Sequence, residues 1–187
     1  MVETDSKGNK ILKVGSEKFV EYISEEKIQK RIAELGEEIS KEYRDKLPVF
    51  IGILNGSFLF MADLMKNVTV RSEIDFLKLS SYGDAKISSG KVELIKELNA
   101  DITDRYVVVV EDIVDSGLSI KYISELILKH QPAGLKVASL LVKPKSIKYD
   151  VKVDYTGFEI PDKFVLGYGL DYAQKYRNLR SIFILSE

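Results

Sequence analysis

Four consecutive valines at positions 107–110 are followed directly by two carboxylates, Glu111 and Asp112. A run of β-branched residues is typical of a strand that is buried on both faces, as the strands of a parallel sheet are. We expect the strand to end at the acidic pair, with a short loop and then a helix after it. Because parallel α/β sheets bind ligands just beyond the carboxyl ends of their strands, this segment predicts an α/β fold and the place of its site.

The expected loop combines a third carboxylate, Asp115, with Ser116, Gly117 and Ser119. Backbone N–H groups of a Ser/Gly turn at a helix N-terminus are suited to hold a phosphate. The two carboxylates before the loop suit a hydrated Mg²⁺, which usually takes only one or two of them. The third carboxylate is then available for proton transfer. Together these groups indicate a site for a phosphorylated sugar and Mg²⁺.

The rest of the chain alternates between helical and strand-like patterns. Apolar residues between Ile28 and Tyr43 recur every three or four positions, which predicts an amphipathic helix that ends before Pro48. We expect strands at 49–54, 69–80, 92–95, 107–110 and 137–142, helices at 58–66 and 119–129, and shorter strands at 151–158, 164–168 and 181–185. This alternation favours a mostly parallel, twisted sheet flanked by helices.

The segment from Glu111 to Ser119 resembles the ribose-phosphate motif of the type I phosphoribosyltransferases. In that motif two acidic and two apolar residues precede Asp, Thr or Ser, Gly, any residue, and Thr or Ser, and every required position is met here. One alternative is a buried strand with a solvated acidic turn. Another is a response regulator, but its acidic pair would follow the first strand of the domain, whereas this pair lies past the middle of the chain.

Two further motifs precede this segment. The turn Leu54–Ser57 resembles the family's pyrophosphate-binding turn, which often carries a cis peptide after its Leu; here Asn55 replaces the family's basic residue. Ser81 and Tyr82, with the loop to Gly90, resemble the family's catalytic lid, although a plain hairpin loop also fits this stretch. The chemistry needs a lid, because water would capture an oxocarbenium-like carbon in an open site.

Other motifs follow the acidic segment. Lys143 ends a predicted strand, where it suits either a donor to a base oxygen or a surface lysine. The run from Ile160 to Tyr172 resembles the purine-binding hood of the hypoxanthine-guanine phosphoribosyltransferases. Arg177 matches the family's pyrophosphate-contacting arginine, although an isolated arginine is more often a surface charge.

The resemblance implies the type I phosphoribosyltransferase fold, with a small hood subdomain and a flexible lid loop. It implies a purine salvage reaction: ribose 5-phosphate passes from phosphoribosyl pyrophosphate to hypoxanthine or guanine, giving IMP or GMP and pyrophosphate, with Mg²⁺ as cofactor. The implied contacts with phosphoribosyl pyrophosphate are Asn55, Gly56, Ser81, Tyr82, Glu111, Asp112, Asp115, Ser116, Gly117, Leu118, Ser119 and Arg177. The implied purine contacts are Ile113, Lys143, Phe164, Val165 and Asp171, with Asp115 as general base at N7 and with Glu111, Asp112 and Asp171 near Mg²⁺.

Composition sets further bounds. With 187 residues, the chain suits one domain, 1–187, whose hood would combine the N-terminal segment with about 143–187. A net charge of −1 and no long basic run give no indication of nucleic-acid or membrane binding. There is no cysteine, which fits a cytoplasmic location, and no run of the about 20 apolar residues that span a bilayer. The polar stretch Met1–Lys10 is expected to be a loose lead-in without a signal peptide's apolar core.

Two other functional classes stay open. A regulator that senses phosphoribosyl pyrophosphate and binds nucleic acid would be expected to carry a basic face. A transferase for xanthine or a pyrimidine would need different base contacts; an ammonium at Lys143 has no acceptor for a 6-amino group, which argues against adenine. The single histidine, His130, lies near a predicted helix end and is interpreted as structural. Family resemblance also implies a homodimer or homotetramer.

Overall fold

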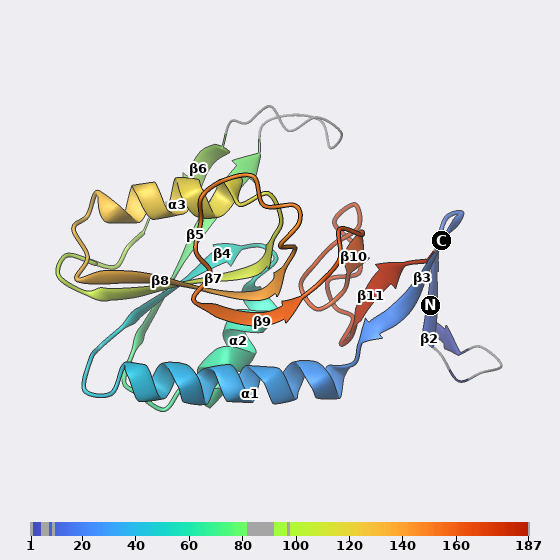
Figure 1. The fold of residues 1–187 in the computed structure, drawn as a ribbon, viewed down its shortest axis with the longest axis horizontal. Coiled ribbons are helices and arrows are strands. Elements are labelled where there is room, and N and C mark those ends of the chain that lie inside the picture. Colours follow the sequence, from blue (N-terminus) through green and yellow to red (C-terminus); the bar gives the residue numbers. More distant parts are fainter. Residues whose placement is uncertain (1, 5–7, 9, 82–91, 97, 187) are drawn as a thin grey trace.

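The computed structural model describes residues 2–4, 8, 10–81, 92–96 and 98–186. Its larger sheet has six strands in the order β6-β5-β4-β7-β8-β9 (Figure 1). These are β4 (Val49–Leu54), β5 (Glu73–Ser81), β6 (Val92–Lys96), β7 (Tyr106–Val114), β8 (Gly134–Val142) and β9 (Tyr155–Glu159). Neighbouring strands are parallel except β5 and β6, which are antiparallel. The expected mostly parallel α/β sheet is confirmed.

Helices cover both faces of this sheet (Figure 1). Helices α1 (Glu25–Glu42) and α2 (Phe58–Asn67) lie on one face, and α3 (Leu118–Leu128) lies on the other. Successive side chains of a strand point to opposite faces. Phe50 and Val108 therefore join the core under α1 and α2, whereas Ile51 and Val109 join the core under α3. The valine run is buried on both faces, as the sequence predicts.

Helix α1 lies on the sheet through the apolar stripe predicted between Ile28 and Tyr43. The helix begins where Ser24 caps it, with the Ser24 hydroxyl accepting a hydrogen bond from the Lys27 N–H. Gly36 faces α2, and a Cβ at this position would lie 2.6 Å from the Cβ of Asn67. The glycine therefore lets the two helices pack closely on the same face of the sheet.

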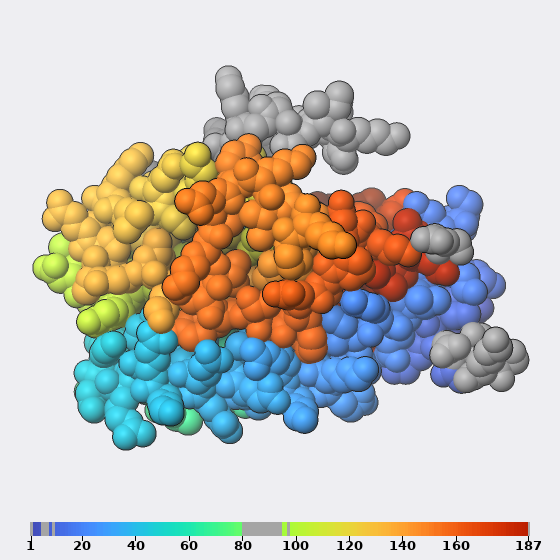
Figure 2. All heavy atoms as spheres, in the orientation of Figure 1, coloured from blue at the N-terminus to red at the C-terminus, as the bar shows by residue number. Residues whose placement is uncertain are grey.

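A smaller antiparallel sheet has the strand order β1-β2-β3-β11-β10. Its strands are β1 (Val2–Thr4), β2 (Lys10–Val14), β3 (Glu17–Ile23), β10 (Val165–Leu166) and β11 (Ile182–Leu185). Because β3 pairs with β11, the two ends of the chain lie side by side, blue beside red in Figures 1 and 2. Leu12, Phe19, Leu166 and Phe183 form its core.

Several sequence-based boundaries were wrong. Residues Val2–Thr4 form a strand rather than part of a loose lead-in, because they pair with β2 and Val2 packs against the small sheet's core. Strand β7 does not end at the acidic pair but continues to Val114, since β8 pairs with it along that length. Strands β5 and β9 begin later than expected, at Glu73 and Tyr155. Within the described residues, no helix is long and apolar enough to cross a membrane.

A buried carboxylate, Asp75, fastens the edge of the large sheet. Asp75 accepts hydrogen bonds from the N–H groups of Phe76, Asn99 and Ala100 and from the Lys96 ammonium, at 2.6–3.1 Å. Burial alone would raise the pKa of Asp75, but these donors lower it to about 2. The carboxylate thus joins β5 to the end of β6 and to the segment that follows it.

We expect Asp75→Asn to weaken the fold at neutral pH. A carboxyl group whose pKa is lowered in the folded state stabilises it above the unfolded pKa, and this stability is lost as the pH falls toward 2. The cited shift corresponds to about 2 kcal/mol of unfolding free energy at pH 7. Urea unfolding at pH 7 and pH 3 measures this. If the difference in unfolding free energy between the wild type and Asp75→Asn is as large at pH 3 as at pH 7, the stabilising role of the Asp75 carboxylate is contradicted.

Candidate active site

The loop between β7 and α3 has the geometry of an anion-binding turn. Gly117 has a φ of 85° and directly precedes α3. A Cβ at this position would lie 2.9 Å from a methyl of Val151, so both the backbone angle and the packing favour glycine. The Ser116 hydroxyl accepts a hydrogen bond from the Leu118 N–H at 3.3 Å. The first N–H groups of a helix lack partners within the helix, so this end of α3 can hold a phosphate.

The acidic pair lies within β7 rather than at the end of the strand. Glu111 is buried, and its Oε2 has no hydrogen-bond partner among the described residues. Burial and the neighbouring Asp112 raise the pKa of Glu111 well above its usual value. Burial also raises the pKa of Asp112 to about 6, against the lowering effects of the Ile113 N–H and of Arg177. Both carboxylates are therefore costly to ionise until a cation or a hydroxyl donor reaches them.

We expect Asp112→Asn to make the ligand-free protein more stable at high pH. A raised carboxyl pKa means that the folded state loses stability as the pH rises from about 4 to about 6, here by about 3 kcal/mol. Removing the charge should therefore raise the melting temperature by about 5 to 10 °C at pH 8 for a chain of this size, and by much less at pH 4.

Thermal melts at both pH values, without Mg²⁺, measure this effect. The exposed Glu125 of α3 supplies a matched control, Glu125→Gln, with no expected change. An equal shift of the Asp112→Asn melting temperature at pH 4 and pH 8 would contradict the expectation.

A second turn approaches the acidic pair from β4. The Leu54–Asn55 peptide bond is cis, as the resemblance implies. A Cβ at Gly56 would lie 1.7 Å from Oδ2 of Asp112, and a Cβ at Gly169 would lie 2.1 Å from the Gly56 carbonyl oxygen. Three segments that are distant in the sequence therefore touch at Gly56, with no room for a side chain there. Asn55 itself is exposed.

A cavity of about 250 Å³ opens beside these turns. Its volume lies just below the range of about 300–1,000 Å³ that is usual for drug-sized ligands, and so suits a single heterocycle. Asp112, Ile113, Asp115, Lys143, Phe164, Val165, Leu170 and Asp171 line it. The cavity brings together all five predicted purine contacts and the predicted general base.

One ion pair dominates this cavity. The Lys143 ammonium lies 2.8 Å from Oδ2 of Asp115 and 3.6 Å from Oδ1 of Asp162. The Lys143 side chain is only 9% exposed, whereas that of Asp115 is 51% exposed. Lys143 directly follows β8 and is held against Asp115 in the loop before α3. Its burial excludes the surface-lysine alternative.

An aromatic ring, that of Phe164, also lines the cavity. Phe164 is 45% exposed, and its ring packs edge-on against Phe19 and Tyr172, with centroids 6.1 and 5.6 Å away. The neighbouring Val165 is buried in β10, where it pairs with Ile184 of β11. An open ring face next to a fixed strand offers a stacking surface for an aromatic base.

Asp171 and Arg177 close the site near Gly56. The Arg177 guanidinium lies 2.7 Å from Oδ1 of Asp171 and donates a hydrogen bond to the Gly169 carbonyl, also at 2.7 Å. The other oxygen of Asp171 accepts from the Gln174 N–H at 2.8 Å. Arg177 is therefore part of this site rather than an isolated surface charge.

Some predicted residues cannot be placed, and others were missed. Ser81 ends β5, while Tyr82 and the predicted lid loop lie outside the described residues. Over the described ranges, no group of three or more acidic or histidine side chains is arranged to hold a metal. Sequence reasoning missed Leu170 and Asp162, which lie between motif positions and carry no signal of their own.

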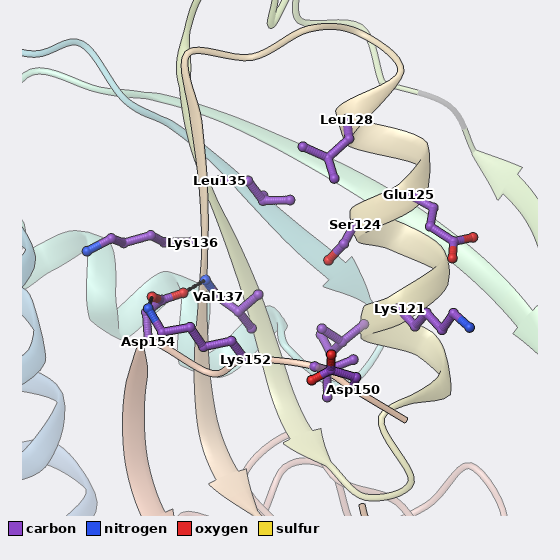
Figure 3. Close-up of a pocket in the computed structure, with 12 residues that line it drawn as sticks. Lys121, Ser124, Glu125, Leu128, Leu135, Lys136, Val137, Asp150, Lys152 and Asp154 are labelled. Atoms are coloured by element: carbon purple, nitrogen blue, oxygen red, sulfur yellow. Dashed lines mark hydrogen bonds and ion pairs between the residues drawn. The ribbon is translucent and has the colours of Figure 1, made fainter. Parts of the chain in front are cut away.

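A larger cavity, of about 430 Å³, lies between α3 and residues 150–154 (Figure 3). It contains none of the predicted site residues. Its lysines already have partners: Lys121 lies over the Tyr149 ring, and Lys152 lies 2.6 Å from Asp154. Lys136 pairs with Glu42. The smaller cavity, where charged groups converge, is therefore the better candidate for chemistry.

Comparison with known proteins agrees with this assignment. A family described as the phosphoribosyl transferase domain matches residues 21–173. The chain is 48% identical to the hypoxanthine-guanine phosphoribosyltransferase of Bacillus subtilis over 163 residues, covering 87% of this chain and 91% of that protein. It is 45% identical to the hypoxanthine phosphoribosyltransferase of Salmonella typhimurium over 159 residues, covering 84% and 89%.

Solved structures show the same relationship. A hypoxanthine-guanine phosphoribosyltransferase from Bacillus anthracis, with HEPES in its active site, matches with a TM-score of 0.84 and 42% identity, over 89% of this chain and 98% of that one. A hypoxanthine phosphoribosyltransferase from Staphylococcus aureus matches with a TM-score of 0.85 and 42% identity, over 89% and 90%. Because the family match spans residues 21–173 and these relatives are 42–48% identical over most of their length, the chain belongs to the phosphoribosyl transferase family.

Proposed function

We propose that this protein transfers ribose 5-phosphate from phosphoribosyl pyrophosphate to N9 of hypoxanthine or guanine, forming IMP or GMP and pyrophosphate. The observation that carries the proposal is the Asp115–Lys143 pair, 2.8 Å apart at the wall of a base-sized cavity and beside a phosphate-binding turn. The names of the relatives support the same reaction. The reaction would recover free purine bases as nucleotides, which is purine salvage.

The base would be held from three sides. Lys143 donates to the 6-oxo oxygen, Phe164 stacks on the ring, and the Val165 backbone pairs with the base edge. The Asp115 carboxylate accepts the proton of purine N7 as N9 attacks the ribose, which makes it the general base. Ile113 and Asp171 complete the wall of the cavity.

The sugar phosphate would be held by the loop at the start of α3. The N–H groups and hydroxyls of 115–119 cradle the 5-phosphate, while Glu111 and Asp112 face the ribose hydroxyls. Glu111 Oε2 is buried without a partner among the described residues, which suits a ribose hydroxyl or a cation-bound water.

The leaving pyrophosphate would lie between the Asn55–Gly56 turn, Ser81, Tyr82 and Arg177. Backbone N–H groups of the turn and the Arg177 guanidinium stabilise its growing negative charge. Tyr82 and the loop after it, which lie outside the described residues, would keep water from the reacting carbon. This side of the site has no basic side chain at Asn55, so backbone groups carry the turn's contribution.

The donor set fits Mg²⁺. Glu111, Asp112 and Asp171 supply hard oxygen ligands, and Mg²⁺ is usually held by one or two carboxylates, waters and substrate phosphates. When bound, the ion would neutralise charge on the pyrophosphate. The raised pKa values of Glu111 and Asp112 indicate carboxylates that gain from a neighbouring cation.

The domain organisation, the oligomeric state and the cellular location of the protein remain predictions. We expect residues 1–187 to act as one phosphoribosyltransferase domain, with the small sheet and the segment from about 143 to 187 as its hood. We also expect a homodimer or homotetramer and a cytoplasmic location. Light scattering after size-exclusion chromatography and cell fractionation test the last two.

The direct test is pyrophosphate release by the purified protein with phosphoribosyl pyrophosphate, Mg²⁺ and each of hypoxanthine, guanine, xanthine and adenine. Turnover with hypoxanthine or guanine, but not adenine, is the expected result. Binding of phosphoribosyl pyrophosphate without turnover of any base would overturn the proposal in favour of a sensor. Turnover with xanthine alone would assign a different base.

A further inference from the structure

A buried tyrosine, Tyr168, which is not among the proposed substrate contacts, joins the turn after β10 to helix α2. Tyr168 is 4% exposed and lies in the turn 167–170, which follows β10. Its hydroxyl donates a hydrogen bond to Oδ2 of Asp63 on α2 at 2.6 Å. Gln29 of α1 donates to the same oxygen at 2.7 Å and lies 3.3 Å from the Tyr168 hydroxyl. The Tyr168 side chain thus contacts both α1 and α2, the two helices on one face of the large sheet.

The turn around Tyr168 has a demanding backbone. Gly167, Tyr168 and Gly169 all have positive φ, at 96°, 50° and 98°. A φ above zero is uncommon for a tyrosine, and such a conformation persists only where surrounding contacts hold it. The N–H groups of Tyr168 and Gly169 donate to the carbonyls of Leu179 and Arg177, at 2.8 and 2.9 Å. These bonds hold the turn to its own segment, whereas the phenol holds it to α2.

The 167–170 turn contacts two parts of the site, the 54–57 turn and Arg177. Gly169 lies against the Gly56 carbonyl so closely that a Cβ would approach it to 2.1 Å. The Gly169 carbonyl also accepts the hydrogen bond from Arg177. The turn therefore lies between the 54–57 turn, which precedes α2, and the Arg177 guanidinium, the two groups assigned here to the leaving pyrophosphate.

Asp63 is well placed to act as the anchor. It lies on α2, the helix that the 54–57 turn begins, and its side chain is 19% exposed. Burial works against its charge, but hydrogen bonds from Lys66, Tyr168 and Gln29 keep the pKa of Asp63 below its usual value. The bond from Tyr168 is thus charge-assisted, and such bonds are stronger and shorter than neutral ones.

We propose that Tyr168, through its hydrogen bond to Asp63, is a positioning residue that sets the 167–170 turn and Arg177 against the Asn55–Gly56 turn and so forms the pyrophosphate side of the site. The proposal rests on the phosphoribosyltransferase function proposed above. The stacking ring and the strand at the base edge do not depend on this bond, because Phe164 and Val165 are held by β11: the Leu185 N–H donates to the Phe164 carbonyl, and Val165 pairs with Ile184.

Tyr168→Phe tests this by removing only the hydroxyl. Tyr155→Phe is the matched control: Tyr155 is equally buried, at 2% exposed, and its hydroxyl also donates to a helix carboxylate, Glu42. Tyr155 begins β9, where it pairs with Ala138 of β8, and neither Tyr155 nor Glu42 lines the cavity of the site. A purely structural role would lower stability in both variants and alter substrate constants in neither.

We expect Tyr168→Phe to raise KM for phosphoribosyl pyrophosphate, and KM for pyrophosphate in the reverse reaction, by about tenfold. The KM for hypoxanthine should change far less, because Phe164 and Val165 keep their places in the cavity. Tyr155→Phe should change none of these constants. An unchanged KM for phosphoribosyl pyrophosphate in Tyr168→Phe, or an equal rise in both variants, would overturn the proposal.

Hydrogen exchange separates this proposal from the proposed function. In Tyr168→Phe, amides of the 167–171 segment should exchange faster than in the wild type, whether or not the wild-type protein forms IMP, and Tyr155→Phe should leave them unchanged. Unaltered exchange in Tyr168→Phe overturns the positioning role; absence of IMP from the wild type overturns the function alone. If Tyr168→Phe does not fold, Asp63→Asn and its control Glu42→Gln provide the same comparison.

Discussion

Asp115→Asn is expected to lower kcat for IMP formation by about 10²–10⁴-fold, the usual contribution of a general base. An asparagine has the shape of the aspartate but cannot accept the N7 proton. Asp115 is half-exposed, so its loss of charge should change the melting temperature little. Initial rates with saturating phosphoribosyl pyrophosphate, Mg²⁺ and hypoxanthine measure the effect, and KM values should change far less than kcat.

The chain offers a matched control for this variant. Asp162 is also near the Lys143 ammonium, at 3.6 Å, but it does not line the cavity. Asp162→Asn makes the same chemical change beside the same lysine and should leave kcat nearly normal. A near-normal kcat in Asp115→Asn, or an equal loss in both variants, would remove Asp115 from the role of base.

Lys143→Ala is expected to lower kcat/KM for hypoxanthine by about tenfold to a hundredfold, the loss of one hydrogen bond from a charged donor. Adenine has no 6-oxo group to accept that bond, so its already low kcat/KM should not fall in parallel. The preference for 6-oxopurines over adenine should therefore collapse. Competition assays with the two bases measure the ratio directly.

Lys145→Ala is the control for this second variant. Lys145 lies two residues further along and is exposed, so its truncation removes a charge of the same sign without reaching the cavity. We expect an unchanged base preference. A hypoxanthine-to-adenine ratio in Lys143→Ala that equals the wild-type ratio would show that another group reads the 6-oxo position.

The large sheet could be predicted from the sequence because its signal is local. A valine run, an amphipathic stripe and turn residues each identify one element within a few positions. The N-terminal part of the small sheet could not: β1 and β2 are only three and five residues long, β1 pairs with β2, β2 pairs with β3, and β3 in turn pairs with β11 at the other end of the chain. Contacts between residues so far apart leave no periodic pattern in either segment.

The site was predictable to the extent that it consists of contiguous motifs. The 111–119 segment identified Asp115, the end of a predicted strand identified Lys143, and the hood run identified Phe164; the structure brings all three to one cavity. What escaped prediction are relations between segments, such as the approach of Gly169 to Gly56 and the bond from Tyr168 to Asp63. In the sequence, nothing distinguishes Tyr168 from an ordinary aromatic core residue.

The ion pair between Asp115 and Lys143 has a consequence for how a purine enters the cavity. Before a base arrives, each group neutralises the charge of the other. On the proposed roles, binding is an exchange of partners: the ammonium leaves a carboxylate for a carbonyl oxygen, while the carboxylate leaves an ammonium for an N–H. The ammonium, whose side chain is only 9% exposed, has a partner both before and after the base binds, which avoids the desolvation penalty of a lone buried charge. A heterocycle that can satisfy only one of the two groups leaves the other without a partner, so the pair recognises the 6-oxo oxygen and N7 together.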